Sequence, residues 1–326
     1  MSGHVFSAVQ QSALDPAGPQ AERIGDVWWL MFWVCAVVMA LVTLALLGGL
    51  LHARRRRESE APQPIAPESH RRMTWVVSGA LATTAVILLV LLAASVSTGR
   101  ALGSLTSPDA LVIEVIGRQW WWEVRYMDDQ PSNILTDANE IHIPVGRPVL
   151  IRGTSRDVIH SLWVPNLHGK KDLIPGYVTD TWIQADRPGV FRGQCAEFCG
   201  LQHAHMAFLV VAEPPAKFQA WRAAASQPAR PPRTPLELRG QQVFLNRQCA
   251  LCHTVLGTDA GGRIGPDLTH VASRRTLGAG TLPNTRGHLA GWIVDPQSVK
   301  PGNRMPQNPM PSEDLLALLA YLESLQ

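Results

Sequence analysis

The longest hydrophobic stretches of the chain lie in its first third. Residues 27–51 and 73–97 contain no charged side chain. About 20 apolar residues in a helix are enough to cross the hydrocarbon core of a bilayer. Because both stretches exceed the usual length of a buried helix in a water-soluble domain, they predict a two-helix transmembrane hairpin. We place this hairpin in an N-terminal segment of residues 1–107.

The connection between the two predicted spans is strongly basic. It contains the arginines Arg54, Arg55, Arg56, Arg57, Arg71 and Arg72. By the positive-inside rule this loop faces the cytoplasm, so everything after residue 97 lies on the outer, periplasmic side of a bacterial-type cell membrane. Between two spans, such a cluster is not expected to bind nucleic acid. Residues 1–26 lack the apolar core of a cleavable signal peptide, so either the first span acts as the insertion signal or a leader has been removed.

Beyond residue 107 the hydrophobic pattern changes to short alternating segments. Residues 111–126, 140–155 and 181–195 are rich in β-branched and aromatic side chains and are punctuated by proline and glycine. Such a pattern is typical of short strands in a β-sandwich or barrel. The sequence therefore predicts a β-domain over residues 108–213.

The last third of the chain predicts helices. Residues 214–235 combine a short helix with a stretch rich in proline and arginine, which predicts a semi-rigid linker. Residues 311–326 carry leucines at helical spacing, with Ser312 as the expected N-cap. A small all-α domain is predicted over residues 236–326.

The composition agrees with this multidomain organisation. The 326 residues are 46% hydrophobic and 17% charged, which excludes both a disordered chain and a transporter with many spans. The net charge of +3 is too small to indicate nucleic-acid binding. One of the five cysteines, Cys35, lies in the first span, and the others form two pairs.

The sequence CAEFCGLQHAHM, residues 195–206, concentrates possible metal ligands. Its cysteines, a histidine and a methionine recur at spacings of three or four residues: Cys195, Cys199, His203 and Met206. His160, at the end of an apolar segment upstream, adds a second imidazole. Thiolate, imidazole and thioether ligands together favour copper.

Other interpretations of the two cysteines are open at this point. A Cys195–Cys199 disulfide suits an exported domain, but it leaves both histidines and the methionine without a role. Zinc takes cysteine and histidine ligands, whereas methionine is a poor zinc ligand. A mononuclear blue-copper site uses one cysteine, whereas two cysteines with two histidines can bridge a pair of copper ions.

Residues 249–253 carry the C-x-x-C-H pattern of covalent haem attachment. In this pattern Cys249 and Cys252 add to the haem vinyl groups, and His253 becomes an axial ligand. The second axial ligand is expected to be a methionine or histidine C-terminal to the motif. Met305 and Met310 are the candidates, because His270 and His288 are expected to be surface residues. A methionine ligand raises the haem potential relative to histidine, which suits electron donation toward copper.

Residues 195–206 resemble the CxExCGxxHxxM loop of cytochrome c oxidase subunit II. DVIHSLWVP (157–165) is similar to that family's upstream ligand strand, and GRQWWWEVRY (117–126) to its aromatic segment. The resemblance covers the hairpin and the β-domain. It implies a cupredoxin-like β-sandwich that holds the mixed-valence dicopper centre CuA, in which two cysteine sulfurs bridge both copper ions.

The resemblance also implies how the remaining copper ligands are divided. His160 and Met206 complete one copper ion. His203 and the backbone carbonyl of Glu197 complete the other. His205 does not match the motif and is expected to be a bystander.

Three further expectations come from the resemblance. Trp120 occupies the position where electrons enter from the cytochrome, and the Glu197 carboxylate is expected to bind a magnesium ion shared with the catalytic subunit. The pattern GxxMP of small cytochromes c favours Met305 as the axial ligand, and Pro266 matches the proline whose backbone supports the axial histidine. Residues 98–107 lack the acidic residue that feeds a proton channel in many relatives, so that role is not expected here.

Together these features predict the electron-transfer subunit II of a haem–copper cytochrome c oxidase with a fused, small all-α cytochrome c domain. A cytochrome or another donor would reduce haem c, which passes electrons to CuA and on to the oxygen-reducing, proton-translocating subunit I. Other membrane subunits and lipid are further expected partners. Alternatives are the CuA subunit of a nitric oxide reductase and a copper-delivery protein, although the latter needs neither a tethered haem nor Met206. Residues 108–213 are hereafter the copper domain and residues 236–326 the haem domain.

Overall fold

The computed structural model describes residues 9–56, 67–103, 107 and 110–326. Contacts divide the chain into two compact units, residues 22–105 and the remainder. Of the arginines predicted to face the cytoplasm, Arg57 lies outside the described residues with the rest of 57–66, whereas the others belong to the two long helices on either side. The predicted boundary between the copper domain and the haem domain lies within the larger unit and stays a prediction.

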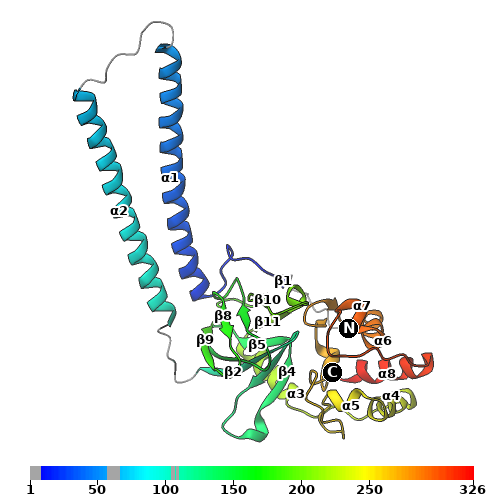
Figure 1. The fold of residues 1–326 in the computed structure, drawn as a ribbon. Helices are drawn as coiled ribbons and strands as arrows, with labels where there is room; N and C mark the ends of the chain where they lie inside the picture. The colour runs from blue at the N-terminus through cyan, green and yellow to red at the C-terminus, as the bar shows by residue number, and fades with distance from the viewer. Residues whose placement is uncertain (1–8, 57–66, 104–106, 108–109) are drawn as a thin grey trace. The chain divides into compact units, whose positions relative to one another are not determined.

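The smaller unit consists of most of two long helices, α1 (Pro19–Arg56) and α2 (Pro67–Gly103), drawn in blue and cyan in Figure 1. Each helix contains one predicted span and is long and apolar enough to cross a membrane. The side chains of their most apolar windows are not buried inside the protein, as they would be in a water-soluble core. The prediction of two long apolar helices is confirmed, and a lipid environment fits their exposed surfaces.

The larger unit contains a β-sandwich of two sheets. The first sheet has the order β5–β11–β10–β7–β8 with β1 paired to β10, and the second has the order β4–β3–β2–β6–β9. The strands of the first sheet are β1 (Val9–Gln10), β5 (Glu140–Pro144), β7 (His160–Trp163), β8 (Lys171–Leu173), β10 (Gly189–Cys195) and β11 (Ala207–Glu213). The strands of the second are β2 (Leu111–Arg118), β3 (Trp121–Tyr126), β4 (Leu135–Ala138), β6 (Val149–Ser155) and β9 (Thr179–Ile183).

The core of this sandwich is filled from alternating strand positions. Ile113 and Val115 of β2, Ile151 of β6 and Phe208 of β11 are all fully buried in one hydrophobic cluster. Alternate residues of a strand face the same side, so the apolar alternation seen in the sequence places these side chains between the sheets. The predicted cupredoxin-like β-sandwich is confirmed.

Strand pairing brings distant segments to one end of the first sheet. β10 pairs antiparallel with β11 on one side and with β7 on the other, with Cys195 opposite Leu162. The loop between β10 and β11 is closed where the Cys195 backbone N–H donates to the Met206 carbonyl at 2.9 Å. The start of β7 and both ends of this loop therefore meet at one end of the sandwich.

The predicted linker is anchored to the β-sandwich. Its helix α3 (Pro215–Ala225) inserts Phe218 fully into the core of the sandwich. Trp221 of the same helix stacks on His142, with ring centroids 4.0 Å apart. This part of the predicted linker therefore packs as a piece of the copper domain, because its apolar face is covered by the sheet.

The haem domain is mainly helical, as predicted. Its helices are α4 (Pro235–Asn246), α5 (Cys249–Cys252), α6 (Arg286–Val294), α7 (Pro296–Val299) and α8 (Ser312–Ser324), and its short strands are β12 (Thr276–Leu277) and β13 (Leu282–Pro283). Three 3₁₀ segments complete the larger unit: η1 (Pro131–Asn133), η2 (His203–His205) and η3 (Val271–Ser273).

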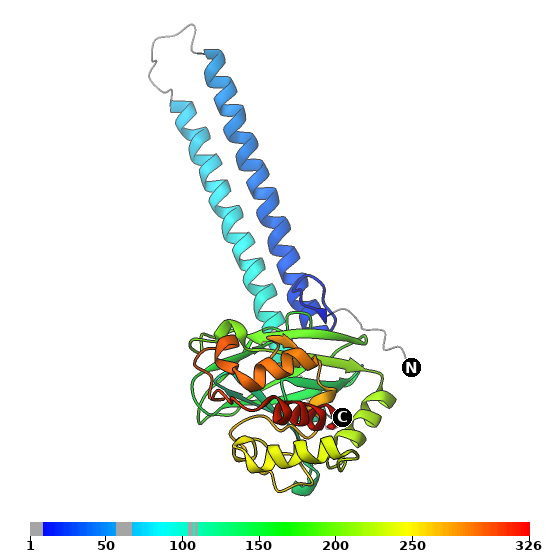
Figure 2. The same ribbon diagram turned by 90° about the vertical axis from the view of Figure 1, so that its right-hand side faces the viewer.

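Two helices form the frame of the haem domain, α4 and α8, which run side by side (Figure 2). A Cβ atom at Gly240 would lie 2.0 Å from the Ala317 carbonyl oxygen, so glycine allows the two backbones to touch. The prediction that Ser312 is the N-cap of the last helix is wrong by one position. Pro311 is the N-cap, because its extended backbone makes Ser312 the first helical residue.

Candidate copper and haem sites

The residues predicted to bind copper come together at one end of the first sheet, where β7 begins and β10 ends. Cys195 ends β10 and His160 begins β7. Cys199, His203 and Met206 lie on the loop that connects β10 to β11. Strand ends and a closed loop thus supply all five side chains.

Their donor atoms are close to one another. The sulfur atoms of Cys195 and Cys199 are 3.8 Å apart. Nδ1 of His160 lies 3.9 Å from the Cys195 sulfur, and Nδ1 of His203 lies 3.6 Å from the Cys199 sulfur. The Met206 sulfur is 3.8 Å from that of Cys199.

This donor set fits copper. Both cysteines are free thiols, and the donor atoms of His160, Cys195 and Cys199 lie within 4.8 Å of one another in a buried group. The carbonyl oxygen of Glu197 lies 3.2 Å from the Cys195 sulfur. Two thiols, two imidazoles, a thioether and a carbonyl are a soft set that matches copper better than zinc.

The two thiols differ in acidity before metal binds. The hydrogen bond with Cys199 lowers the pKa of Cys195 to about 3. The same hydrogen bond, together with burial, raises the pKa of Cys199. Metals bind the thiolate form, so the pair offers one deprotonated ligand and holds one proton that binding of copper would release.

His160 is oriented from two sides. Its Nε2 lies 2.8 Å from the Oδ1 atom of Asp157, while the other Asp157 oxygen accepts from the Gln119 backbone N–H at 2.8 Å. A carboxylate on the outer ring nitrogen fixes the tautomer and orientation of a ligating histidine. At Gly117 a Cβ atom would lie 2.6 Å from the imidazole ring, so only glycine leaves room for it.

Trp120 rests against the copper loop and is 9% exposed. Its indole N–H donates to the Cys199 carbonyl at 3.0 Å, and the Gln119 side chain donates to the same oxygen at 2.8 Å. The predicted electron-entry residue is therefore hydrogen-bonded to the backbone of a predicted copper ligand.

Two other positions considered from the sequence have partners outside the donor cluster. The Glu197 carboxylate is 42% exposed and pairs with Lys170 at 3.0 Å. The magnesium ion expected at this carboxylate stays a prediction. Nδ1 of His205 bonds to the Gln202 side chain at 2.9 Å, which agrees with its expected role as a bystander.

The haem-attachment motif has the geometry that covalent attachment needs. Cys249 and Cys252 are the first and last residues of α5 and are free, partly exposed thiols. Residues three apart in a helix share a face. Nδ1 of His253 lies 2.7 Å from the Pro266 carbonyl, so Nδ1 carries the proton and Nε2 keeps its lone pair for a metal. These residues fit a c-type haem.

The two candidate axial methionines have different surroundings. Met310 packs against the hydrophobic core of the haem domain. Met305 lies in a loop held through its backbone, since its N–H donates to Asn303 at 2.8 Å and its carbonyl accepts from Gln297 at 2.7 Å. The backbone of Met305 is thus fixed without using its thioether, which favours Met305 as the ligand.

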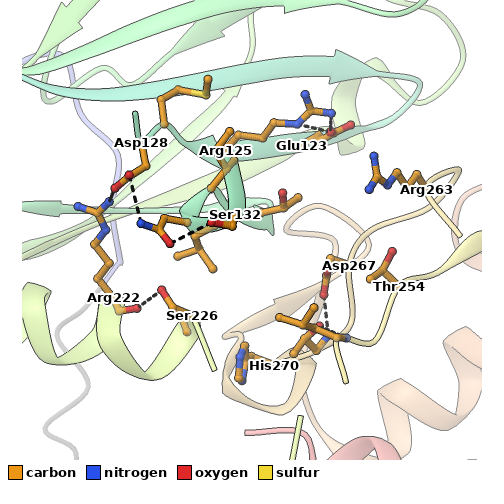
Figure 3. Close-up of a pocket in the computed structure, with 18 of the residues that line it drawn as sticks. Glu123, Arg125, Asp128, Ser132, Arg222, Ser226, Thr254, Arg263, Asp267 and His270 are labelled. Atoms are coloured by element: carbon orange, nitrogen blue, oxygen red, sulfur yellow. Dashed lines mark hydrogen bonds and ion pairs between the residues drawn. The ribbon is translucent and has the colours of Figure 1, made fainter. Parts of the chain in front are cut away.

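A groove of about 830 Å³ lies between the copper and haem domains (Figure 3). Strands β3 and β4, helix α3 and the loop after His253 form its walls. Some of its charged groups pair with each other, as in the ion pairs Arg222–Asp128 and Arg125–Glu123. None of the predicted copper or haem ligands lines it, so we assign it no role in these sites.

Asp157 and Gly117 were not predicted from the sequence. Asp157 stands three residues before His160. Several other polar residues stand three residues before a predicted ligand, so this spacing alone does not single out Asp157. A glycine inside an apolar strand does signal close approach of another group. The identity of that group, His160, depends on which strands lie across the sandwich.

Comparisons with known proteins extend over most of the chain. Residues 130–213 match the family model "Cytochrome C oxidase subunit II, periplasmic domain", and residues 238–326 match the model "Cytochrome c". The cytochrome c oxidase subunit 2 of Alkalihalophilus pseudofirmus is 39% identical over 97% of this chain and 91% of its own. That of Bacillus sp. strain PS3 is 30% identical over 97% and 91% of the two chains. The solved periplasmic domain of subunit II of cytochrome oxidase from Bradyrhizobium japonicum is 31% identical, covering 37% of this chain and 96% of that chain with a TM-score of 0.34.

Replacing Asp157 by Asn should weaken copper binding by about 10- to 100-fold, because an amide holds the His160 ring less firmly than a carboxylate. Copper retained by the full chain against a chelator measures this effect. Asp180→Asn, at an exposed position of β9, makes the same charge change as a control. Equal copper affinity of the Asp157 variant and the wild-type chain would contradict the assigned role.

The haem absorption spectrum of the full chain should change when Met305 is replaced by Ala and should not change in the Met310→Ala variant. Loss of a thioether ligand alters the electronic state of the iron, whereas Met310 contributes to packing. The opposite pattern would make Met310 the axial ligand.

Proposed function

The chain belongs to the cytochrome c oxidase subunit II family, and we propose that it passes electrons through its own haem to a dicopper centre. A cytochrome c domain follows the subunit II domain in the same chain. Its relatives are components of a haem–copper terminal oxidase, an oxidoreductase. In this proposal the electrons continue from the dicopper centre, CuA, to the oxygen-reducing and proton-translocating subunit I.

The proposal rests on the position of Trp120 between the two sites. On one side its indole donates to the carbonyl of Cys199. On the other, its backbone carbonyl accepts from Lys300 of the haem domain at 2.8 Å, and a Cβ atom at Gly302 would lie 3.8 Å from its ring. Three residues after Gly302 stands Met305, the proposed haem ligand. The contacts of Trp120 with Lys300 and Gly302, close in sequence to Met305, support a short path between the two predicted sites.

When bound, the haem and the copper pair each supply a carrier of one electron. The role of the chain is to hold them. Cys249, Cys252 and His253, with Met305, would hold the haem. Two copper ions would be held by the thiols, imidazoles, thioether and carbonyl of the loop and of β7: Cys195, Cys199, His160, His203, Met206 and the Glu197 carbonyl. Donors fixed at strand ends and supported by neighbours such as Asp157 move little when charge changes, and small rearrangement favours fast electron transfer.

Both domains lie in one compact unit. Electron transfer between sites on one chain does not wait for a bimolecular encounter, since tethering sets a high effective concentration. A copper-delivery protein would have no use for such a tethered haem domain, so electron transfer accounts for both parts of the chain.

The surroundings of the chain complete the proposal. Helices α1 and α2 would cross the cell membrane and contact subunit I, other membrane subunits and lipid. The copper and haem domains would lie on the outer side, where an external cytochrome or another donor reduces the haem. The magnesium ion expected at Glu197 would require that carboxylate to leave Lys170 and meet ligands supplied by subunit I.

Replacing Cys199 by Ser in the assembled complex tests this function. Haem reduction should proceed as in the wild type. Oxygen consumption should fall by more than about 100-fold, because Cys199 is a proposed copper ligand and even a group that only supports a ligand typically costs about 10- to 100-fold. Cys35→Ser, in the apolar part of α1, is the matched control and should leave turnover unchanged.

Two results would contradict the proposal. The first is oxygen consumption at the wild-type rate in the Cys199→Ser complex. The second is a wild-type complex that turns over with nitric oxide and not with oxygen, which would place the chain in a nitric oxide reductase.

A further inference from the structure

Lys300 of the haem domain is an unusual buried charge. It follows helix α7 directly, and only 2% of its surface is exposed. Lysine is almost never buried this fully without a charged partner. Here the ammonium group donates to three backbone carbonyls instead: Trp120 at 2.8 Å, His205 at 2.8 Å and Gly278 at 2.9 Å.

The three acceptors match a protonated lysine. An ammonium group has three N–H donors, whereas a neutral amine has two. Burial lowers the pKa of Lys300 to about 7, and the coulombic effect of Cys199 opposes this shift. The three carbonyls are all satisfied by the ammonium form, which has three donors. Hydrogen bonds from a charged donor are about twice as strong as neutral ones.

Two of these carbonyls belong to the copper domain and one to the haem domain. If the domains separated, the Lys300 ammonium would keep Gly278 and lose Trp120 and His205. Its hydrogen bonds therefore stabilise the docked domains relative to the separated domains. Both hydrogen bonds lie beside the predicted copper site, since Trp120 contacts the copper loop and His205 immediately precedes the predicted ligand Met206.

Neighbouring contacts show close packing around Lys300. Gln202 donates to the Pro301 carbonyl at 2.8 Å, and the Ala207 backbone N–H donates to the Ala279 carbonyl at 2.9 Å. A Cβ atom at Gly280 would lie 2.8 Å from that of Ala207. The register between the domains is therefore tight here, and a shift would break several hydrogen bonds at once.

A second group of contacts lies farther along the same interface. Arg274 pairs with Asp137 at 2.7 Å. The backbone N–H of Arg275 donates to the Glu140 carboxylate at 2.6 Å. The Arg275 amide is thus covered only while the domains are docked, which makes it a reporter of docking.

We propose that Lys300 is a positioning residue that fixes the haem domain in one register on the copper domain through the carbonyls of Trp120 and His205. The proposal rests on the proposed function, because this register is what sets the segment leading to Met305 against Trp120. Lys300 donates to backbone carbonyls of its own chain, so this role needs no other molecule.

Hydrogen exchange of the full chain, loaded with haem and copper, tests the docking role directly. In the Lys300→Met variant the amides of Ala207 and Arg275 should exchange about tenfold faster or more, because loss of charge-assisted hydrogen bonds makes separation of the domains more frequent. Amides in the middle of α8 should keep their protection, which shows that the haem domain itself remains folded. Lys217→Met, at an exposed position of α3, should change neither group of amides.

Lys300→Gln is the second variant, in case the apolar side chain prevents folding, since its amide keeps two N–H donors but no charge. Unchanged exchange at Ala207 and Arg275 would overturn the proposal. So would equal acceleration in α8, which would indicate general destabilisation.

A kinetic measurement separates this proposal from the proposed function. After photochemical reduction of the haem, transfer to copper should be independent of solvent viscosity in the wild-type chain. In the Lys300→Met variant the transfer rate should be about tenfold lower and should fall further as sucrose is added. Separated domains must diffuse together before the electron can pass, and viscosity slows this diffusion. Absence of transfer in the wild-type chain would refute the proposed function. Equal, viscosity-independent rates in both chains would refute the role of Lys300.

Discussion

The hydrogen bond from the Cys195 backbone to the Met206 carbonyl closes the loop on which the other features depend. Because β10 and β11 pair with each other up to this hydrogen bond, the two ends of the loop are fixed in the sheet. The pairing of β7 with β10 then brings His160 to the same end. Trp120 bonds to the middle of the loop and the haem domain to its end. One closed loop thus holds the proposed copper ligands and receives the haem domain.

The linker between the two domains contributes to this arrangement. It was predicted to be a semi-rigid tether, yet it is anchored at both ends. Phe218 is buried in the copper domain, and Arg230 bonds to the Ser324 carbonyl at the end of α8 and to Glu237 of α4. Anchoring shortens the free part of the linker and therefore restricts the positions that the haem domain can adopt. The interface at Lys300 selects one of them.

Much of the fold and of the candidate site could be predicted from the sequence, because the relevant information is local. Apolar length predicts the two helices, alternation predicts the strands, and the spacing of Cys195, Cys199, His203 and Met206 predicts a metal loop. The C-x-x-C-H pattern is equally local. The supporting groups could not be found in this way. Gly117 meets His160 only through the packing of two sheets, and Lys300 meets Trp120 across 180 positions of the chain. Neither pairing leaves a periodic pattern that a sequence can reveal.

The central claim is that the loop of Cys195 and Cys199 holds two copper ions that share one electron. Electron paramagnetic resonance of the copper-loaded full chain tests it most directly. We expect a hyperfine pattern produced by one unpaired electron spread equally over two copper nuclei. A pattern from a single copper nucleus would contradict it, since a mononuclear site uses one of the two cysteines and leaves the other without a role.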